Sequence, residues 1–186
     1  LVGRLTHSLA RRMIAIAAPW ISLLLFGGGL ALDRVLTTAI TRNFDSGLEY
    51  VLMAMIRSSE IGPDGEVRLI EPLGDQRFLE PYSGVYWQIS GGGQEPYRSR
   101  SLWERTLEVA PTDDDEKIHT HDSRQFPEEK LRVLERTVIL PGSSVKWHYQ
   151  IAQSREALDA QKSVLRRTLF PSLALLGLGL ILLAAI

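Results

Sequence analysis

Two long uncharged stretches constrain this chain more than any other feature. The first, MIAIAAPWISLLLFGGGLAL, covers residues 13–32, and the second, LFPSLALLGLGLILLAAI, covers residues 169–186. An α-helix rises about 1.5 Å per residue, so about 20 apolar residues cross a hydrocarbon core of about 30 Å. The pattern therefore predicts two transmembrane helices, at 13–32 and 169–186. Because the second stretch is still apolar at Ile186, we expect it to be truncated and the chain to be a fragment.

A cleaved secretory signal is the alternative interpretation of the first stretch. Basic residues precede it, and Gly29-Leu30-Ala31 has the small-x-small pattern of a cleavage site. Two features favour an uncleaved anchor instead. The apolar run is longer than a usual signal core of about 7–15 residues. A helical pattern of apolar residues also continues beyond it, at Leu36, Ile40, Phe44, Leu48, Leu52 and Met55.

The charges that flank the spans predict the orientation. Arg4, Arg11 and Arg12 precede the first span without an acidic residue among them, so residues 1–12 are expected in the cytoplasm. Residues 33–168 then lie outside. Three cations just before the second span disagree with this topology: Lys162, Arg166 and Arg167. The first helix, however, usually decides the orientation of the whole chain.

Residues 33–168 are predicted to form one α+β domain, in the order helix, antiparallel sheet, helix. An amphipathic helix is expected from Asp33 to about Ser59, and a second helix from a possible N-cap at Ser154 into the second span. Turn signals separate these elements at GPDG, residues 62–65, at GGGQEP, residues 91–96, and at Pro141-Gly142. The expected strands are 66–70, 84–90, 97–103, 130–140 and 145–153, and 84–90 and 97–103 should form a hairpin.

Strand 84–90 alternates between apolar and polar residues. Val85, Trp87 and Ile89 point to one face, whereas Tyr86, Gln88 and Ser90 point to the other, which we expect to face water. The pattern predicts that Trp87 packs in the core, between the sheet and one of the long helices.

Composition excludes several classes of function. The net charge of -1 gives no basic patch of the kind that nucleic-acid-binding proteins carry, so no nucleic acid is expected as a partner. The absence of cysteine excludes disulfides, cysteine-based zinc sites and thiol catalysis.

Three segments carry a resemblance to a known family: RFLEPYSGVYWQI at 77–89, YRSRSLW at 97–103 and LRVLERTVILPG at 131–142. With the two spans, they resemble the N-terminal sensor region of bacterial membrane sensor histidine kinases. More narrowly, the chain looks like the proteobacterial type, in which two spans flank a PAS-like periplasmic domain.

The resemblance implies a two-component system. A cytoplasmic part beyond this segment would autophosphorylate on His, with ATP and Mg as cofactors, and pass the phosphate to a response regulator. The protein would be a homodimer in the inner membrane, with residues 33–168 periplasmic. This segment itself is expected to hold no catalytic residue and no cofactor. Its four histidines lack a His-Glu-x-x-x-Pro setting, and no Asp-x-Gly-x-Gly motif occurs: His7, His119, His121 and His148.

Two other hypotheses stay open. The chain could be the sensor region of a chemoreceptor or a diguanylate cyclase, or a membrane-anchored binding domain with no output. Gly27 and Ala31 form a small-xxx-small pair in the first span, which permits close helix approach and fits dimerisation.

The acidic segment TDDDEKIHTHDS, at 112–123, is a candidate metal site. Carboxylates offer oxygen ligands for Mg²⁺ or Ca²⁺, and imidazoles suit transition metals. The resemblance also implies a site for divalent cations, because some relatives carry an acidic patch that these cations neutralise and from which cationic peptides displace them. A solvated acidic loop is the alternative. The candidate ligands are Asp113, Asp114, Asp115, Glu116, His119 and His121.

Arg98 and Arg100 are a candidate ligand site. They lie two positions apart in the predicted strand 97–103, hence on one face, with Trp87 and Trp103 nearby. Two guanidinium groups beside aromatic rings can hold a carboxylate or phosphate. The alternative is that the tryptophans belong to the core and the arginines extend their charges to water.

Overall fold

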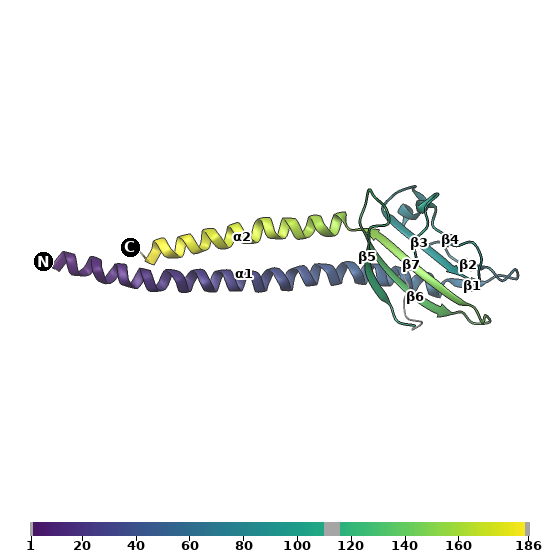
Figure 1. The fold of residues 1–186 in the computed structure, drawn as a ribbon, viewed down its shortest axis with the longest axis horizontal. Helices are drawn as coiled ribbons and strands as arrows, with labels where there is room; N and C mark the ends of the chain where they lie inside the picture. The colour runs from purple at the N-terminus through teal and green to yellow at the C-terminus, as the bar shows by residue number, and fades with distance from the viewer. Residues whose placement is uncertain (1, 110–115, 185–186) are drawn as a thin grey trace. The chain divides into compact units, whose positions relative to one another are not determined.

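The fold was examined in a computed structural model, which describes residues 2–109 and 116–184, with side chains over 15–109 and 116–183. Its contacts divide the chain into two units, one made of Leu1–Thr41 with Leu158–Ile186, and one made of Arg42–Ala157. The elements follow in this order (Figure 1): α1 Val2–Arg57, β1 Ser59–Ile61, β2 Val67–Leu69, the 3₁₀ helix η1 Gln76–Leu79, β3 Val85–Gly91, β4 Tyr97–Arg98, the 3₁₀ helix η2 Arg100–Leu102, β5 His119–Ser123, β6 Leu131–Ile139, β7 Lys146–Ser154 and α2 Glu156–Ala184.

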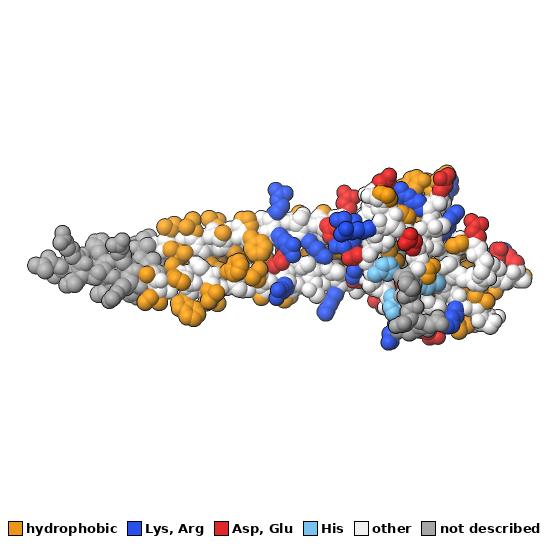
Figure 2. Space-filling model, viewed as in Figure 1, with side chains coloured by type: hydrophobic (Ala, Val, Ile, Leu, Met, Phe, Trp, Pro, Cys, Tyr) orange, Lys and Arg blue, Asp and Glu red, His pale blue; other side chains and the backbone are white. Residues whose placement is uncertain are grey.

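Two helices are long and apolar enough to span a membrane, over Ala15–Arg57 and Glu156–Leu183. Their apolar side chains are mostly exposed, among them Trp20, Leu24 and Leu183. On the face shown in Figure 2, hydrophobic side chains gather along the apolar parts of the helices, and Lys and Arg side chains follow where these parts end. The two predicted apolar helices are therefore present. Their length and composition suit a bilayer, because exposed apolar surface of this extent is unfavourable in water.

In the helical unit, α1 and α2 pack directly against each other (Figure 1). A Cβ atom added to Gly29 would lie 2.6 Å from Leu173 Cδ1, so a larger residue there would require the Leu173 side chain to move. Arg166 donates hydrogen bonds to both carboxylate oxygens of Asp33, at 2.9 and 3.2 Å. Asp33 is buried and is the first residue after the predicted span 13–32. Its ion pair with Arg166 therefore holds the two helices together at the end of that span.

The first helix continues without a break to Arg57, through Pro19. This confirms the expectation that the amphipathic pattern after residue 33 extends the same helix. Its residues Leu48, Leu52 and Met55 are fully or almost fully buried in the second unit. The helix ends just before a small hairpin of β1 and β2, in which Gly62–Gly65 form the predicted turn.

The main sheet has five antiparallel strands in the order β4-β3-β7-β6-β5. The predicted strands at 84–90, 130–140 and 145–153 are confirmed as β3, β6 and β7, and the hairpin of β3 with β4 is also confirmed. The first long strand, β3, pairs with the last, β7, over seven residues. Strand β5 was not expected, because HTHDS contains no apolar residue and lies at the edge of the sheet.

One face of the sheet packs on the end of α1. Its core consists of Val85, Trp87 and Ile89 from β3, Leu134 from β6, Trp147, Tyr149 and Ile151 from β7, and the buried α1 residues. Trp87 is only 7% exposed, so its predicted place in the core is confirmed. The alternation in β7 also follows the prediction, because Trp147, Tyr149 and Ile151 share this face.

The opposite face is buried as well, and the expectation that Tyr86, Gln88 and Ser90 face water was wrong for the first two. Tyr86 and Gln88 are fully buried, and Ser90 is half-buried. The physical reason is that the long connections between β4 and β6 cover this face with Leu102, Leu107 and Phe126. A second, smaller core forms there with Tyr86, Leu131, Val133 and Ala152.

Candidate functional site

A pocket of about 300 Å³ lies at the edge of the sheet domain. Apolar and aromatic side chains from β2, η1, β3 and β4 form most of its wall, and two arginines lie at its border. The lining residues are Leu69, Pro72, Leu73, Phe78, Leu79, Trp87, Tyr97, Arg98, Ser99 and Arg100. An apolar cavity with a few polar groups is the usual form of a small-molecule site.

Arg98 and Arg100 both line this pocket, although not in the way the sequence suggested. Strand β4 ends at Arg98, and Arg100 begins the 3₁₀ helix η2, so the predicted strand over 97–103 was wrong beyond Arg98. The cause is local hydrogen bonding. Ser99 Oγ accepts from Trp87 N at 3.1 Å, and Ser101 Oγ donates to the oxygen of Val85 at 2.6 Å. These bonds pull the chain across the end of β3 and curl it into a turn.

The two arginines differ in their surroundings. The Arg98 side chain is partly buried, lies 3.8 Å from a carboxylate oxygen of Glu95 and donates to the oxygen of Arg105 at 3.4 Å. Arg100 is exposed. Both guanidinium groups belong to residues that line the pocket, where they could pair with a carboxylate or a phosphate.

The aromatic residues of the predicted ligand site separate into two groups. Trp87 and Tyr97 form an edge-to-face pair with ring centroids 5.1 Å apart, and both line the pocket. Trp103 is 50% exposed and has a positive φ of 54°, so it is not a core residue. Of the two tryptophans in the predicted ligand site, Trp87 and Trp103, only Trp87 is therefore a core residue.

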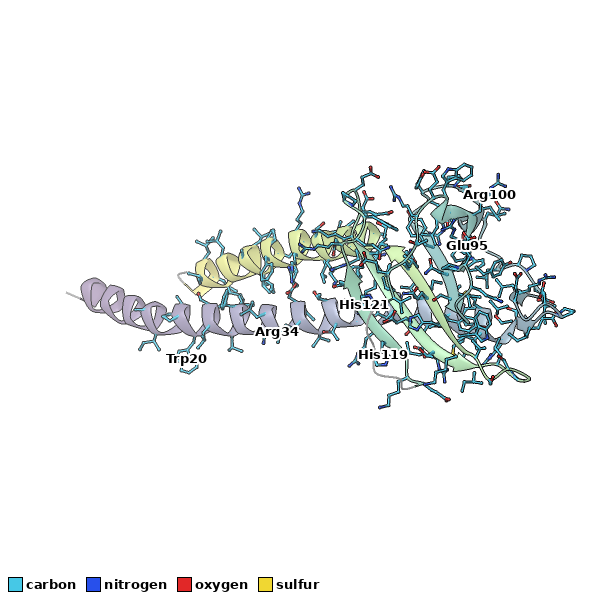
Figure 3. All side chains as sticks on the ribbon, turned by 45° about the vertical axis from the view of Figure 1, so that its right-hand side comes forward. Trp20, Arg34, Glu95, Arg100, His119 and His121 are labelled. Atoms are coloured by element: carbon cyan, nitrogen blue, oxygen red, sulfur yellow. The ribbon has the colours of Figure 1, made fainter. Side chains whose placement is uncertain are left out.

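The described end of the acidic segment, from residue 116 on, leads into β5 at the other edge of the sheet. His119 and His121 are on β5, the edge strand opposite β4, and Figure 3 shows them apart from Glu95 and Arg100. Glu116 is exposed, and its backbone oxygen accepts a hydrogen bond from Arg136. Asp113, Asp114 and Asp115 lie outside the described residues. Within the described ranges, no group of three His, Asp or Glu side chains is arranged to hold a metal ion. The metal site stays a prediction.

A buried polar network on the face opposite α1 was missed by the sequence reasoning. Glu135 of β6 and Gln150 of β7 are 0% exposed, and Gln88 of β3 is 1% exposed. Gln150 Nε2 donates to Glu135 Oε2 at 3.1 Å, and Gln88 Nε2 donates to Gln150 Oε1 at 3.2 Å. His148 Nε2 lies 3.0 Å from Glu135 Oε2. The available signal was a row of polar residues at alternate positions of three strands, which is equally typical of a face exposed to water.

A second polar chain links α1 to the residue that precedes α2. Arg132 donates two hydrogen bonds to Asp45 of α1, at 2.8 and 2.7 Å, and one to Asp122 of β5 at 3.0 Å. Asp122 also accepts from Arg155 at 2.7 Å. Hydrogen bonds to Asp45, and then to Asp122, raise the pKa of Arg132 although burial lowers it. The guanidinium stays charged and holds both carboxylates in a fixed geometry.

Comparisons of the chain with models of protein families, with curated proteins and with solved structures find no match.

Proposed function

We propose that this chain is the extracytoplasmic sensor and membrane portion of a two-component sensor histidine kinase. In this proposal, residues 33–168 form a PAS-like periplasmic domain, and residues 13–32 and 169–186 cross the inner membrane. The protein acts as a homodimer. The missing cytoplasmic part carries the phosphorylated histidine and uses ATP and Mg to phosphorylate a response regulator.

The continuity of the two helices carries the proposal. Helix α1 contains the first apolar stretch and, further along, the core residues Leu48, Leu52 and Met55. Helix α2 begins at Glu156, directly after β7 ends at Ser154, and continues into the second apolar stretch. Only Ser58 lies between α1 and β1, and only Arg155 lies between β7 and α2. In the proposal, a change in the sheet therefore moves the helices, whereas a plain anchor does not need such short connections.

The chain Asp45–Arg132–Asp122–Arg155 supports the same proposal. It joins α1, β6, β5 and the residue before α2 by charged hydrogen bonds. Such bonds are shorter and more directional than neutral ones, so they pass a displacement of one strand to both helices.

The pocket beside Arg98 and Arg100 supports a sensor that binds a small ligand. Two cations at the border of a cavity lined by Trp87 and Tyr97 suit an anion with an apolar body. In the proposal, such a ligand closes β4 and η2 over the pocket, and β3 transmits this change to β7 through their shared register.

The topology is tested by fusing a reporter that is active only outside the cytoplasm at the loop around Gly91, with a second fusion after Arg12 as control. We expect activity from the first fusion and none from the second. Activity of a cytoplasmic reporter at the Gly91 loop would overturn the proposed topology and the sensor function with it.

The output is tested on the complete gene product in membrane vesicles. Incubation with labelled ATP and Mg should give acid-labile phosphate on histidine, which a response regulator then removes. A complete protein that instead carries a cyclase domain or a long heptad array, or that labels on no histidine, would favour another two-span receptor. A product that ends shortly after the second span would leave an anchored binding domain.

A further inference from the structure

Three arginines lie just beyond the apolar stretches of the two long helices, where the chain continues into the sheet domain. Arg34 follows the first apolar stretch, and Arg166 and Arg167 precede the second. All three are exposed, and Figure 2 shows Lys and Arg side chains at this end of the apolar surface. All three also belong to the helical unit, so the packing of α1 against α2 sets their relative positions.

Two close contacts give the register of this antiparallel helix pair. A Cβ atom on Gly29 would lie 2.6 Å from Leu173 Cδ1, and one on Gly177 would lie 3.0 Å from Leu25 Cδ1. A step from 29 to 25 along α1 therefore corresponds to a step from 173 to 177 along α2. Extended by one turn in the other direction, the same register places the end of the first apolar stretch level with the start of the second.

The three arginines consequently share one thin layer. Arg34 lies two residues after Leu32, and Arg167 and Arg166 lie two and three residues before Leu169. At about 1.5 Å per residue, their Cα atoms are about 3–5 Å beyond the apolar stretches. A bilayer is about 40–45 Å thick with a hydrocarbon core of about 30 Å, so each headgroup layer is about 5–8 Å deep. With the apolar stretches in the core, the arginines lie at the depth of the headgroups.

Positive charge is in excess in this layer. Its one carboxylate, Asp33, is buried and accepts from Nε and Nη2 of Arg166 at 2.9 and 3.2 Å. A guanidinium has more N–H donors than these two bonds use, and the Arg166 side chain is 55% exposed, so it can bind a second anion as well. Among the described residues, no carboxylate pairs with Arg34 or Arg167.

Phospholipid headgroups offer a matching partner at this depth. A guanidinium binds the oxygens of a phosphate with two parallel N–H···O bonds, which a lysine ammonium cannot do. In a zwitterionic lipid, the ammonium of the same headgroup balances the charge of the phosphate. An excess of cations therefore favours lipids whose headgroup has a net negative charge.

We propose that Arg34, Arg166 and Arg167 form a binding site for the phosphate groups of anionic phospholipids, in the leaflet next to the sheet domain. The inference rests on the proposed membrane crossing of residues 13–32 and 169–186, but not on a kinase output. The bound lipid holds both helices at one depth, because the arginines come from both of them. It also neutralises two of the cations that disagree with the predicted orientation, Arg166 and Arg167.

The experiment uses the full chain in nanodiscs that contain phosphatidylcholine and phosphatidylglycerol. Trace amounts of either lipid, spin-labelled on the acyl chain, report by electron paramagnetic resonance how strongly each associates with the protein. A Lys or Arg near an anionic surface strengthens binding by a factor of about five. We expect a several-fold preference for phosphatidylglycerol, which decreases as salt is added because salt screens exposed charges.

Two variants with the same change of net charge distinguish the site from general electrostatic attraction. The double variant Arg34→Gln, Arg167→Gln should lose most of the preference. Arg166 is kept in it, because its removal would leave a buried carboxylate unpaired. The control variant Arg57→Gln, Arg68→Gln removes two exposed arginines of the sheet unit and should keep the preference of the parent chain.

A depth measurement tests the membrane crossing separately. The sequence contains no cysteine, so Val35→Cys, at a side chain that is 64% exposed, can carry a single spin label. Its collision rates with oxygen and with a water-soluble nickel complex should place it among the headgroups. A label in bulk water would refute the crossing at this level, and both the lipid site and the proposed topology would fail.

With the label at headgroup depth, three outcomes overturn the lipid site alone. One is equal association of the two lipids with the parent chain. Another is an unchanged preference in the double variant, because the arginines would then only extend their charges to water. The third is a preference that inorganic phosphate removes and chloride of the same ionic strength does not, which would assign the arginines to a soluble phosphate.

Discussion

Replacing Trp87 with alanine should destabilise the sheet domain strongly. The side chain is 7% exposed and packs in the core formed by α1, β3, β6 and β7. A tryptophan buries about 150–250 Å² of surface, and at about 25 cal/mol per Å² this corresponds to about 4–6 kcal/mol. The space left by Trp87→Ala would join the neighbouring pocket, so the loss should be somewhat smaller, about 3–5 kcal/mol.

This loss is a large part of a domain stability of about 5–15 kcal/mol. For a domain of this size, a loss of about 4 kcal/mol lowers Tm by roughly 10–20 °C. Thermal unfolding of the full chain in nanodiscs, followed by near-ultraviolet circular dichroism, measures the change. Helix formation and membrane insertion should be unaffected, because Trp87 lies in neither helix.

Trp103→Ala is the matched control. Trp103 is 50% exposed and lies after η2, so its removal should change the unfolding free energy by less than about 1 kcal/mol. Equal melting temperatures for Trp87→Ala and the parent chain would refute the reasoning. Trp87 would then belong to the ligand pocket with Arg98 and Arg100 rather than to the core.

Three further changes have definite expected outcomes. Arg132→Met leaves Asp45 and Asp122 without their shared cation and should cost about 2 kcal/mol in a denaturant titration, with a smaller cost at high salt if surface screening dominates. In the helical unit, Gly29→Val should displace the Leu173 side chain, whereas Gly28→Val, with open space around it, should not; the mobility of a spin label placed next to Leu173 distinguishes the two. Changing Asp113, Asp114, Asp115 and Glu116 to amides should leave the melting temperature unchanged. If the segment senses cations, the variant should also lose the Mg²⁺ or Ca²⁺ dependence of signalling. Superimposable response curves of variant and parent would refute the metal site.

Local patterns in the sequence determined the elements of this protein well. Uncharged runs of helical length predicted both long helices, and the apolar period after residue 33 predicted that the first helix continues toward Leu52 and Met55. Alternation predicted β3, β6 and β7 and the burial of Trp87. These predictions succeeded because helix and strand periods are properties of neighbouring residues, and they require no knowledge of what packs on them.

Only the tertiary structure decided what lies on the second face of the sheet. The polar residues Gln88, Glu135 and Gln150 alternate with apolar ones as they would on a strand exposed to water. They are buried because a connection that contains Leu107 covers them, and the covering depends on contacts between residues far apart in the chain. The pairing of β3 with β7 is of the same kind, since 62 positions separate Gln88 from Gln150.

The two candidate sites show the same division. The sequence identified Arg98 and Arg100 as a pair but placed them on one strand, because the bonds of Ser99 and Ser101 to β3 are tertiary contacts. The network around Glu135 left only a row of alternating polar residues in the sequence, which is equally typical of a strand face exposed to water. Its chemistry comes from complete removal from water beside His148, and burial is a property of the whole fold rather than of any segment.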